Sequence, residues 1–252
     1  MTSIRLHLRL IYLLAGMCWS LAATAESIRV VTEELPPYNM TVNGRLTGLS
    51  TEIVQALLEE AGVEASIQSM PWARAYDIAL NDANVMIYSI TPTPEREPLF
   101  KWVGVVASSR WALYSNGTSD IQLRTLEDAR RYQIATVKQD VGEQFLIANG
   151  FQTGSGLQSS TRYELNYQKL QQGRVDLWIS NELNAAYLAR AAQDNPALTL
   201  RQVLQIPKLG GADGLKIAFS RRTPDETVEH FRKALQRLHD NGVFDAITEK
   251  WL

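Results

Sequence analysis

Two hydroxyl residues and one arginine, at a fixed spacing, carry the chemistry that is easiest to interpret in this 252-residue sequence. Ser89 and Thr91 lie seven and five positions before Arg96. They follow the apolar run Val85–Tyr88, which is typical of a strand buried on both faces. Because side chains alternate along a strand, the two hydroxyls point the same way where that strand ends. A guanidinium near them predicts a place where an anion could bind.

The segment that carries Arg96 has the signals of a helix start. Thr93 can cap a helix N-terminus, Pro94 suits the first helical position, and Glu95 suits the positive end of the helix dipole. Arg96 does not suit that end, because a cation in the first turn costs about 0.3–1 kcal/mol against the dipole. An anion bound beside Arg96 and the free backbone N–H groups would explain why an arginine is found there. The alternative is an ion pair with Glu95 or Glu97 on a solvated surface.

Strands and helices alternate in the part of the chain before Arg96. Apolar runs predict strands at 28–32, 65–69 and 85–88, and helical spacing predicts helices from Ser50 and from Pro71. This order implies right-handed crossovers, a parallel sheet, and a ligand crevice outside the carboxyl ends of its strands. Residues at or near those ends are Glu34, Tyr38, Trp72, Ser89, Thr91 and Arg96. Their convergence favours a binding role for Arg96.

A second unit repeats this logic. Strands are predicted at 133–137 and 175–179, with Asp140 and Asn181 just beyond their ends and Asn181 as the cap of a following helix. Short strands are expected at 102–106, 111–114 and 215–219, with crossings between the units at 107–110 and in the glycine-rich segment 208–214. The run Thr223-Pro224-Asp225-Glu226 is a capping box with Pro at its second position, which predicts a helix with the buried stripe Val228, Phe231, Leu235 and Leu238.

The composition excludes several classes of function. Residues 1–25 read as a signal peptide cleaved after Ala25: Arg5 and Arg9 precede an apolar core too short to span a bilayer. Cleavage removes the only Cys and two of the 25 Lys and Arg, which leaves a formal charge of −4. Without cysteine and with two His, we expect no disulfide, no thiol nucleophile, no metal site and no cofactor. We expect a secreted globular protein that does not bind nucleic acid.

Several motifs, taken in order, resemble a known family. They are Ile28-Arg29-Val30, Pro37-Tyr38, Leu46-Thr47-Gly48, Thr93-Pro94-Glu95-Arg96-Glu97, Gly173-Arg174-Val175-Asp176 and the run from Asn241 to Ile247. Together they resemble family 3 of the bacterial periplasmic solute-binding proteins, the polar amino-acid receptors of ABC importers. The resemblance covers essentially all of the chain after the signal peptide.

The resemblance implies an α/β fold of the type II periplasmic-binding-protein class. Two lobes, each a mainly parallel sheet flanked by helices, would be joined by two hinge strands and close on a small ligand. We expect the first lobe to comprise 26–107 and 211–252, and the second lobe 108–210.

The resemblance also assigns roles to individual residues. It implies that Arg96 grips a ligand carboxylate with help from Ser89 and Thr91, which agrees with the planar fork that guanidinium offers a carboxylate. By the same resemblance Tyr38 and Trp72 are aromatic walls of the site, although each could be ordinary core. Asp140 lies near the anion-side loop of the second lobe, or is only a helix cap.

Two departures from the family pattern bear on the ligand. The family usually meets a ligand ammonium with an Asp where this sequence has the neutral Asn181, and Pro92 stands where similar relatives often carry another Arg. We therefore expect standard α-amino acids to bind weakly, unless Asp140 or Glu34 supplies the missing charge.

The function predicted is periplasmic capture of a small carboxylate-bearing solute, an amino acid or a relative of one, for an ABC permease. We expect a monomer without catalytic activity. One alternative is an enzyme on the same fold, such as a cyclohexadienyl-type dehydratase, in which Glu33, Glu34 or Asp140 is the general acid or base. Another is a stand-alone sensory module.

Overall fold

A computed structural model describes residues 27–251, and the predicted signal peptide lies outside that range. The strands are β1 (Arg29–Thr32), β2 (Met40–Val42), β3 (Arg45–Thr47), β4 (Ile67–Ser69), β5 (Val85–Ile90), β6 (Phe100–Asn116), β7 (Ile134–Val137), β8 (Leu157–Ser160), β9 (Leu177–Asn181) and β10 (Leu200–Ser220). The helices are α2 (Leu49–Glu60), α3 (Trp72–Asn81), α4 (Val141–Ala148), α5 (Tyr163–Gln171), α6 (Glu182–Ala191), α7 (Pro196–Thr199), α8 (Asp225–Asp240) and α9 (Val243–Trp251), with short 3-10 helices η1 (Glu97–Leu99) and η2 (Glu127–Arg131).

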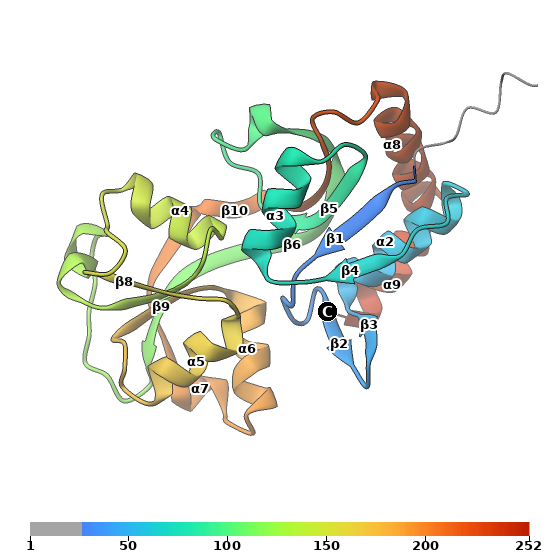
Figure 1. Ribbon diagram of the computed structural model, residues 1–252. Helices are drawn as coiled ribbons and strands as arrows, with labels where there is room; N and C mark the ends of the chain where they lie inside the picture. The colour runs from blue at the N-terminus through green and yellow to red at the C-terminus, as the bar shows by residue number, and fades with distance from the viewer. Residues whose placement is uncertain (1–26, 252) are drawn as a thin grey trace, which may run out of the picture.

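The main sheet has the strand order β4-β1-β5-β10-β6-β9-β7-β8 and runs through two lobes (Figure 1). In the first lobe β1 pairs in parallel with β4 and β5, and in the second β7 pairs in parallel with β8 and β9. Helices α2, α8 and α9 pack on one another in the first lobe, while α5 and α6 pack in the second. The predicted two-lobed α/β fold is confirmed.

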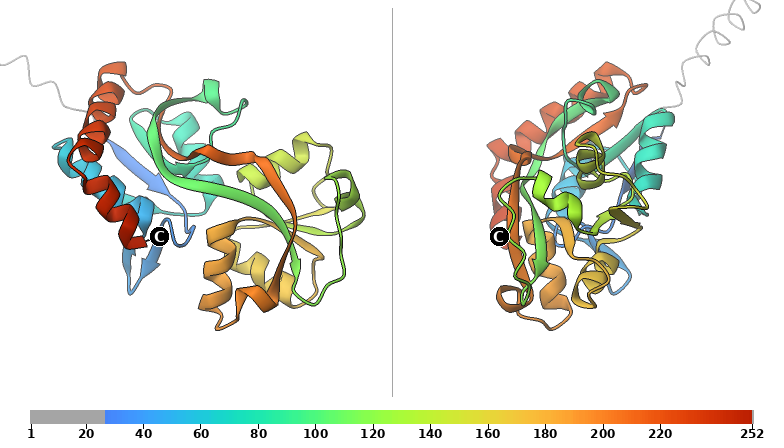
Figure 2. Two further views of the ribbon diagram at one scale, coloured as in Figure 1. Left: turned by 180° about the vertical axis from the view of Figure 1, so that it is seen from behind. Right: turned by 90° about the vertical axis from the view of Figure 1, so that its left-hand side faces the viewer.

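Strands β6 and β10 form one long antiparallel pair that crosses from lobe to lobe (Figure 2). Their register runs from Leu200 opposite Asn116 to Ser220 opposite Phe100. The prediction of separate short strands at 102–106, 111–114 and 215–219 is wrong here, because the polar residues 107–110 continue the strand instead of breaking it. The expected lobe boundaries, at 107/108 and 210/211, fall inside these two strands and stay predictions.

Two glycines let the long strands approach each other at the crossing. Gly210 and Gly214 have φ values of 128° and 45°. A Cβ on either would lie 2.1 Å from a backbone oxygen of β6, that of Ser109 or of Ala107. The ladder is also irregular here, since the register shifts between Gln205 and Gly210 and again before Leu215. The crossing is therefore the least regular part of the sheet.

Two predicted helix starts differ from the structure. After Thr93 the chain makes a turn and the single 3-10 turn η1, because β6 begins only seven residues later and Pro98 lies between. At α8 the buried stripe is confirmed, but Thr223 does not cap the helix: its hydroxyl bonds that of Ser220. A dipole argument for Arg96 therefore does not hold, and its environment has to be read from its contacts.

Candidate ligand site between the lobes

Arg96 lies between the lobes and is only 1% exposed. Its Nη1 donates to the Thr91 carbonyl at 3.1 Å within the first lobe. Its Nε donates to Gln144 Oε1 at 3.0 Å and its Nη2 to the Gln139 carbonyl at 3.4 Å, both in the second lobe. Burial lowers the pKa of the guanidinium, and the nearby Tyr76 and Asp140 partly offset that effect. The side chain is a buried cation whose partners are mostly neutral oxygens.

Two aromatic rings hold the guanidinium in place. Trp72 and Tyr76, one turn apart on α3, stack at 5.6 Å between ring centroids. The Arg96 Cζ lies 5.4 Å and 5.1 Å from these two centroids, which is cation–π distance. Trp72 Nε1 also donates to the Gln139 carbonyl at 2.9 Å. Trp72 thus packs beside Arg96 and forms a contact between the lobes.

The carbonyl of Gln139 is aimed across the cleft by its backbone conformation. Gln139 has φ of 60°, a left-handed value that costs a non-glycine residue about 1 kcal/mol or more. Its N–H donates to Glu143 Oε1 at 2.9 Å, which fixes the turn from β7 to α4. The orientation gives Arg96 and Trp72 a shared acceptor.

Asp140 follows Gln139 and is the N-cap of α4. It is 5% exposed, and each carboxylate oxygen has a donor: the Val141 N–H at 2.5 Å and the Tyr163 hydroxyl at 2.6 Å. Burial raises its pKa to about 6, although the Tyr163 hydrogen bond and the Arg96 charge favour the ionised form. Asp140 is therefore both a helix cap and a charge beside Arg96.

Glu33 places a second carboxylate in the same cluster, at the carboxyl end of β1. It is 4% exposed, and among the described residues its carboxylate has no hydrogen-bond donor and no ion pair. Burial raises its pKa well above the ordinary value, the charge of Asp140 raises it further, and Arg96 opposes both. The cluster thus combines one basic group with two buried acids.

Glu34, its neighbour, points elsewhere, as alternation along an extended chain requires. Its Oε2 accepts from the Thr41 N–H at 2.8 Å, and its Oε1 accepts from the hydroxyls of Thr41 and Ser69, each at 2.7 Å. These bonds join the β2–β3 hairpin to β4. Glu34 therefore supports the first lobe, with both carboxylate oxygens engaged.

The two predicted hydroxyl residues are buried close to Arg96. Ser89 has φ of 59° and donates to Asn39 Oδ1 at 2.5 Å. Thr91 contacts Arg96 through its carbonyl oxygen. Thr91 therefore contacts Arg96 through its backbone, while the Ser89 hydroxyl is engaged with Asn39 in the first lobe, so the carboxylate-binding role of both hydroxyls stays a prediction.

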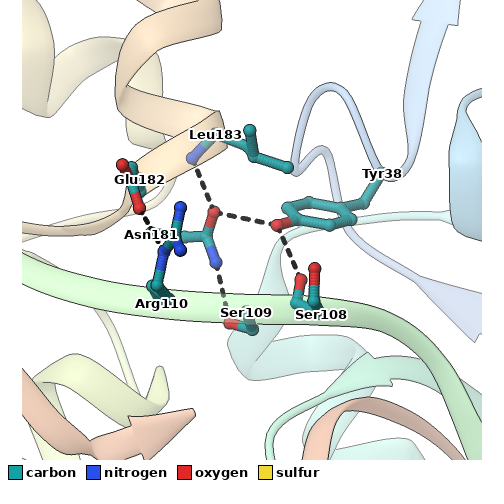
Figure 3. A pocket seen from close by; sticks show the side chains of 7 residues that line it. All are labelled: Tyr38, Ser108, Ser109, Arg110, Asn181, Glu182 and Leu183. Carbon is teal, nitrogen blue, oxygen red and sulfur yellow. Dashed lines mark hydrogen bonds and ion pairs between the residues drawn. The ribbon is translucent and has the colours of Figure 1, made fainter. Parts of the chain in front are cut away.

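Tyr38 and Asn181 meet across the cleft in a pocket beside the crossing strands (Figure 3). The pocket has a volume of about 420 Å³ and is lined by Tyr38, Ser108, Ser109, Arg110, Asn181, Glu182 and Leu183. The Tyr38 hydroxyl lies 3.1 Å from both Asn181 Oδ1 and the Ser108 carbonyl. Asn181 Oδ1 also accepts from the Leu183 N–H at 3.0 Å, and its Nδ2 donates to Ser109 Oγ at 2.7 Å. The predicted helix cap is present, and the amide has no free lone pair aimed at a ligand.

The comparison with known proteins identifies the family. The model of the bacterial extracellular solute-binding proteins, family 3, matches residues 28–252. The chain belongs to this family. The arginine-binding extracellular protein ArtP of Bacillus subtilis is 24% identical over 85% of this chain and 81% of its own length. The L-cystine-binding protein TcyJ of Escherichia coli is 23% identical over 86% and 78%.

Solved structures with the same fold include binding proteins and a sensor. A histidine kinase sensor domain with similarity to periplasmic binding proteins matches with a TM-score of 0.78 and 20% identity, over 90% of this chain and 96% of that chain. An ancestral arginine-binding protein bound to arginine matches with a TM-score of 0.74 and 23% identity, over 90% and 98%. At these identities the likeness shows the fold. The resemblance that the sequence motifs suggested is confirmed.

Sequence reasoning did not single out five residues that this family 3 protein brings to the site. They are Tyr76, Gln139, Gln144, Tyr163 and, outside the enzyme alternative, Glu33. A signal existed for two of them. Tyr76 follows Trp72 by four residues on a predicted helix, so the two share a helix face. Glu33 and Glu34 are neighbours in an extended chain, so their side chains point to opposite sides. Gln139 and Gln144 accept hydrogen bonds from Arg96 only because the two lobes lie against each other, and no local sequence pattern indicates that contact.

Proposed function

We propose that this protein captures a small carboxylate-bearing solute, an amino acid or a relative, between its lobes and passes it to an ABC permease. The observation that carries the proposal is the buried Arg96, which lies beside the stacked rings of Trp72 and Tyr76 and whose fork meets two oxygens of the second lobe. A carboxylate offers two oxygens in the arrangement that this fork prefers. When the lobes part, a ligand carboxylate can replace Gln144 Oε1 and the Gln139 carbonyl. The relatives named as binding arginine and L-cystine support a ligand of this class.

The test is a thermal-shift screen of the chain from Glu26 onward against L-arginine, L-cystine, L-glutamine and small dicarboxylates. A ligand at about 100 times its Kd adds about 2.7 kcal/mol of stability. For a chain of this size each kcal/mol raises Tm by about 2–4 °C, so a shift of several degrees is expected. A panel without any shift would reject the proposal.

A dehydratase on this fold is the second candidate, because the Asp140 pKa of about 6 suits a general acid. Our proposal is that the protein binds without turnover. Proton NMR of the best ligand, before and after overnight incubation with protein, separates the two. Product that accumulates in proportion to protein concentration favours the enzyme.

The proposal includes export to the periplasm with cleavage of the signal peptide after Ala25. It also includes a hinge motion of the two lobes, with the lobe boundaries between residues 107 and 108 and between residues 210 and 211. Among the described residues no helix is both long enough and apolar enough to cross a membrane. N-terminal sequencing of the protein recovered from a periplasmic extract tests the cleavage site. A mature chain that begins elsewhere than Glu26 would correct it.

A further inference from the structure

Glu143 is a buried acid that lies one step behind the contact between the lobes. It is 4% exposed and belongs to the first turn of α4, where an acidic side chain suits the helix dipole. Its Oε2 accepts from the Thr136 hydroxyl at 2.5 Å and from the Ser159 hydroxyl, and its Oε1 accepts from the Gln139 N–H at 2.9 Å. Donors from β7, from β8 and from the β7–α4 turn therefore hold this carboxylate in one position.

The turn that Glu143 contacts has an unfavourable backbone conformation. The Asp140 N–H donates to the Val137 carbonyl at 3.1 Å, which closes a β-turn with Gln139 at its third position. The φ of Gln139 is 60°, and a positive φ at this position is normally found for Gly or Asn. A residue in such a conformation persists only where its surroundings hold it there. The hydrogen bond from the Gln139 N–H to Glu143 supplies that hold from inside the second lobe.

The orientation of this turn matters to the other lobe. The Gln139 carbonyl accepts from Trp72 Nε1 at 2.9 Å and from Arg96 Nη2 at 3.4 Å, and both donors belong to the first lobe. Gln139 therefore donates its N–H to Glu143 within its own lobe and offers its carbonyl across the cleft. Once the N–H loses its acceptor, the strained turn can relax and its carbonyl can turn away from the two donors.

We propose that Glu143 is a positioning residue for the contact between the lobes: by fixing Gln139 it keeps the Gln139 carbonyl directed at Trp72 and Arg96. The three donors to Glu143 all belong to the second lobe, so its effect on the first lobe passes through Gln139. The consequence for binding rests on the proposed function, since a residue that favours contact between the lobes favours retention of a solute between them. The alternative is that the carboxylate only stabilises the fold of the second lobe.

Hydrogen exchange of tryptophan indole groups, followed by NMR, separates these two roles. Of the six tryptophans only Trp19 precedes Glu26, so the chain from Glu26 onward gives five indole signals, which substitution can assign. The Trp72 Nε1–H reports the contact between the lobes, because its acceptor is the Gln139 carbonyl. The Trp178 Nε1–H reports the second lobe alone, because Trp178 lies on β9, is fully buried and has no hydrogen-bond partner among the described residues.

We expect Glu143→Ala to speed exchange of the Trp72 Nε1–H at least about fivefold, the order of one lost hydrogen bond, and to leave that of Trp178 within about twofold. The first lobe, which carries Trp72, keeps its own sequence in this variant, so the effect has to cross the cleft. Glu143→Gln is the matched control, because its amide oxygen can still accept from the Gln139 N–H. It should keep the exchange of Trp72 within about twofold of that in the unmodified protein.

Two results of this measurement would overturn the proposal. Equal acceleration at Trp72 and Trp178 would mean that Glu143 only stabilises the second lobe. Unchanged exchange at Trp72 in Glu143→Ala would mean that the turn keeps its conformation without the carboxylate.

A glycine at position 139 tests the route through the backbone. Glycine adopts a positive φ without the steric cost that a glutamine has there. Adding Gln139→Gly to Glu143→Ala should therefore make exchange of the Trp72 Nε1–H slower than in Glu143→Ala alone. Exchange that is equally fast or faster in the double variant would contradict a role of Glu143 in holding the left-handed turn.

Glu143→Asp repeats the test in a variant that keeps the charge, which matters if Glu143→Ala does not fold. Aspartate is shorter by one methylene, so it cannot serve the two strand hydroxyls and the Gln139 N–H together. Faster exchange at Trp72 with Trp178 unchanged is expected, and no change at Trp72 would count against the proposal. All of these measurements are made without a solute. A solute panel without any thermal shift would therefore reject the proposed function and leave the role of Glu143 in the contact between the lobes standing.

Discussion

Arg96 shows how a charged residue can be buried without an ion pair to any residue that the structure describes. Each of its three nitrogens donates to an oxygen atom, of Thr91, Gln139 or Gln144, and the guanidinium lies at cation–π distance from Trp72 and Tyr76. Each of these partners holds the guanidinium plane in one orientation. These contacts therefore depend on the planar shape of the guanidinium group more than on its charge.

We expect Arg96→Lys to weaken binding of the ligand found in the thermal-shift screen by about 1.5–3 kcal/mol, the range for a hydrogen bond to a charged group. Lysine keeps the charge but cannot present two parallel donors or stack on an aromatic ring as a planar guanidinium does. Calorimetric titration measures the loss, and urea unfolding checks that the lobes stay folded. Binding as tight as in the unmodified protein would mean that charge alone suffices.

Gln144 competes with the ligand for Arg96 if the proposed site is correct. Its Oε1 accepts from Arg96 Nε across the cleft. Gln144→Ala removes this hydrogen bond to a charged group, which contributes about 1.5–3 kcal/mol to the contact between the lobes. A carboxylate that takes the place of Gln144 should then bind more tightly by about tenfold or more in the same titration. Weaker binding would show that Gln144 contacts the ligand instead.

The raised pKa of Glu33 predicts a pH-dependent stability difference. A carboxyl whose pKa is higher in the folded than in the unfolded state costs stability as the pH rises through that range. Glu33→Gln removes this cost, so it should stabilise the unliganded protein, and by more at pH 7.5 than at pH 5. Urea unfolding at both values measures the two differences. A gain that is larger at pH 5 would contradict the assigned direction of the shift.

At the scale of elements, the crossing of β6 and β10 depends on glycine. Gly210→Ala adds a left-handed alanine, which costs about 1–2 kcal/mol, and a contact of 2.1 Å with the Ser109 carbonyl that forces the strands apart. Gly44→Ala is the matched control, because its φ of 77° is also left-handed but nothing lies within 4 Å of the added Cβ. Urea unfolding should show a clearly larger loss for Gly210→Ala. Equal losses of stability in the two variants would mean that β6 and β10 can move apart at the crossing without a measurable cost.

The elements that the sequence predicted well are those with a single, uninterrupted pattern. The apolar run at β5 and the stripe on α8 are examples. The full length of β6 was missed, because Ser108, Ser109 and Arg110 are polar and only pairing with β10 makes them strand. Asn241-Gly242 correctly indicated the end of α8. Helix α9 was missed because it begins directly after this stop signal, at Val243.

The contacts of the candidate site within one lobe could be inferred from local order, and those between the two lobes could not. Ser89 lies near the end of β5, Thr91 comes just after it, and the Thr91 carbonyl accepts a hydrogen bond from Arg96. Glu33, Asp140 and Tyr163 come from three separate places: the end of β1, the β7–α4 turn and the start of α5. No local sequence pattern indicates that these three segments lie close together. The roles that the resemblance implied for these residues stay predictions.

At the scale of the whole molecule, the lobes contact each other directly. Besides the Arg96 contacts, Trp72 donates to the Gln139 carbonyl, Asn184 Nδ2 donates to the Pro36 carbonyl at 2.8 Å, and Tyr38 reaches Asn181. Each of these neutral bonds is worth about 0.5–1.5 kcal/mol net. Together they hold the two lobes against each other.

Spin labels at Val42→Cys and Ala192→Cys would report the distance between the lobes, since residues 26–252 contain no other cysteine. Val42 ends β2, Ala192 lies just after α6, and the neighbouring Thr41 lines the same groove as Ala192. We expect a short-distance population without ligand, which Tyr38→Phe reduces by removing the hydroxyl shared by Ser108 and Asn181. A distance distribution that Tyr38→Phe leaves unchanged would show that this hydroxyl does not stabilise closure.

The place of β10 in the sheet also sets the order in which the chain can fold during synthesis. The second part of β10, from Leu215 to Ser220, lies between β5 and β6 in the middle of the first lobe's sheet. Until the ribosome has made these residues, β5 lacks its neighbour and the first lobe cannot close its core. The segment that forms the second lobe is complete earlier. A chain bound for export would thus keep its first lobe unfolded until almost all of it has been translated, which is the state that a secretion channel requires.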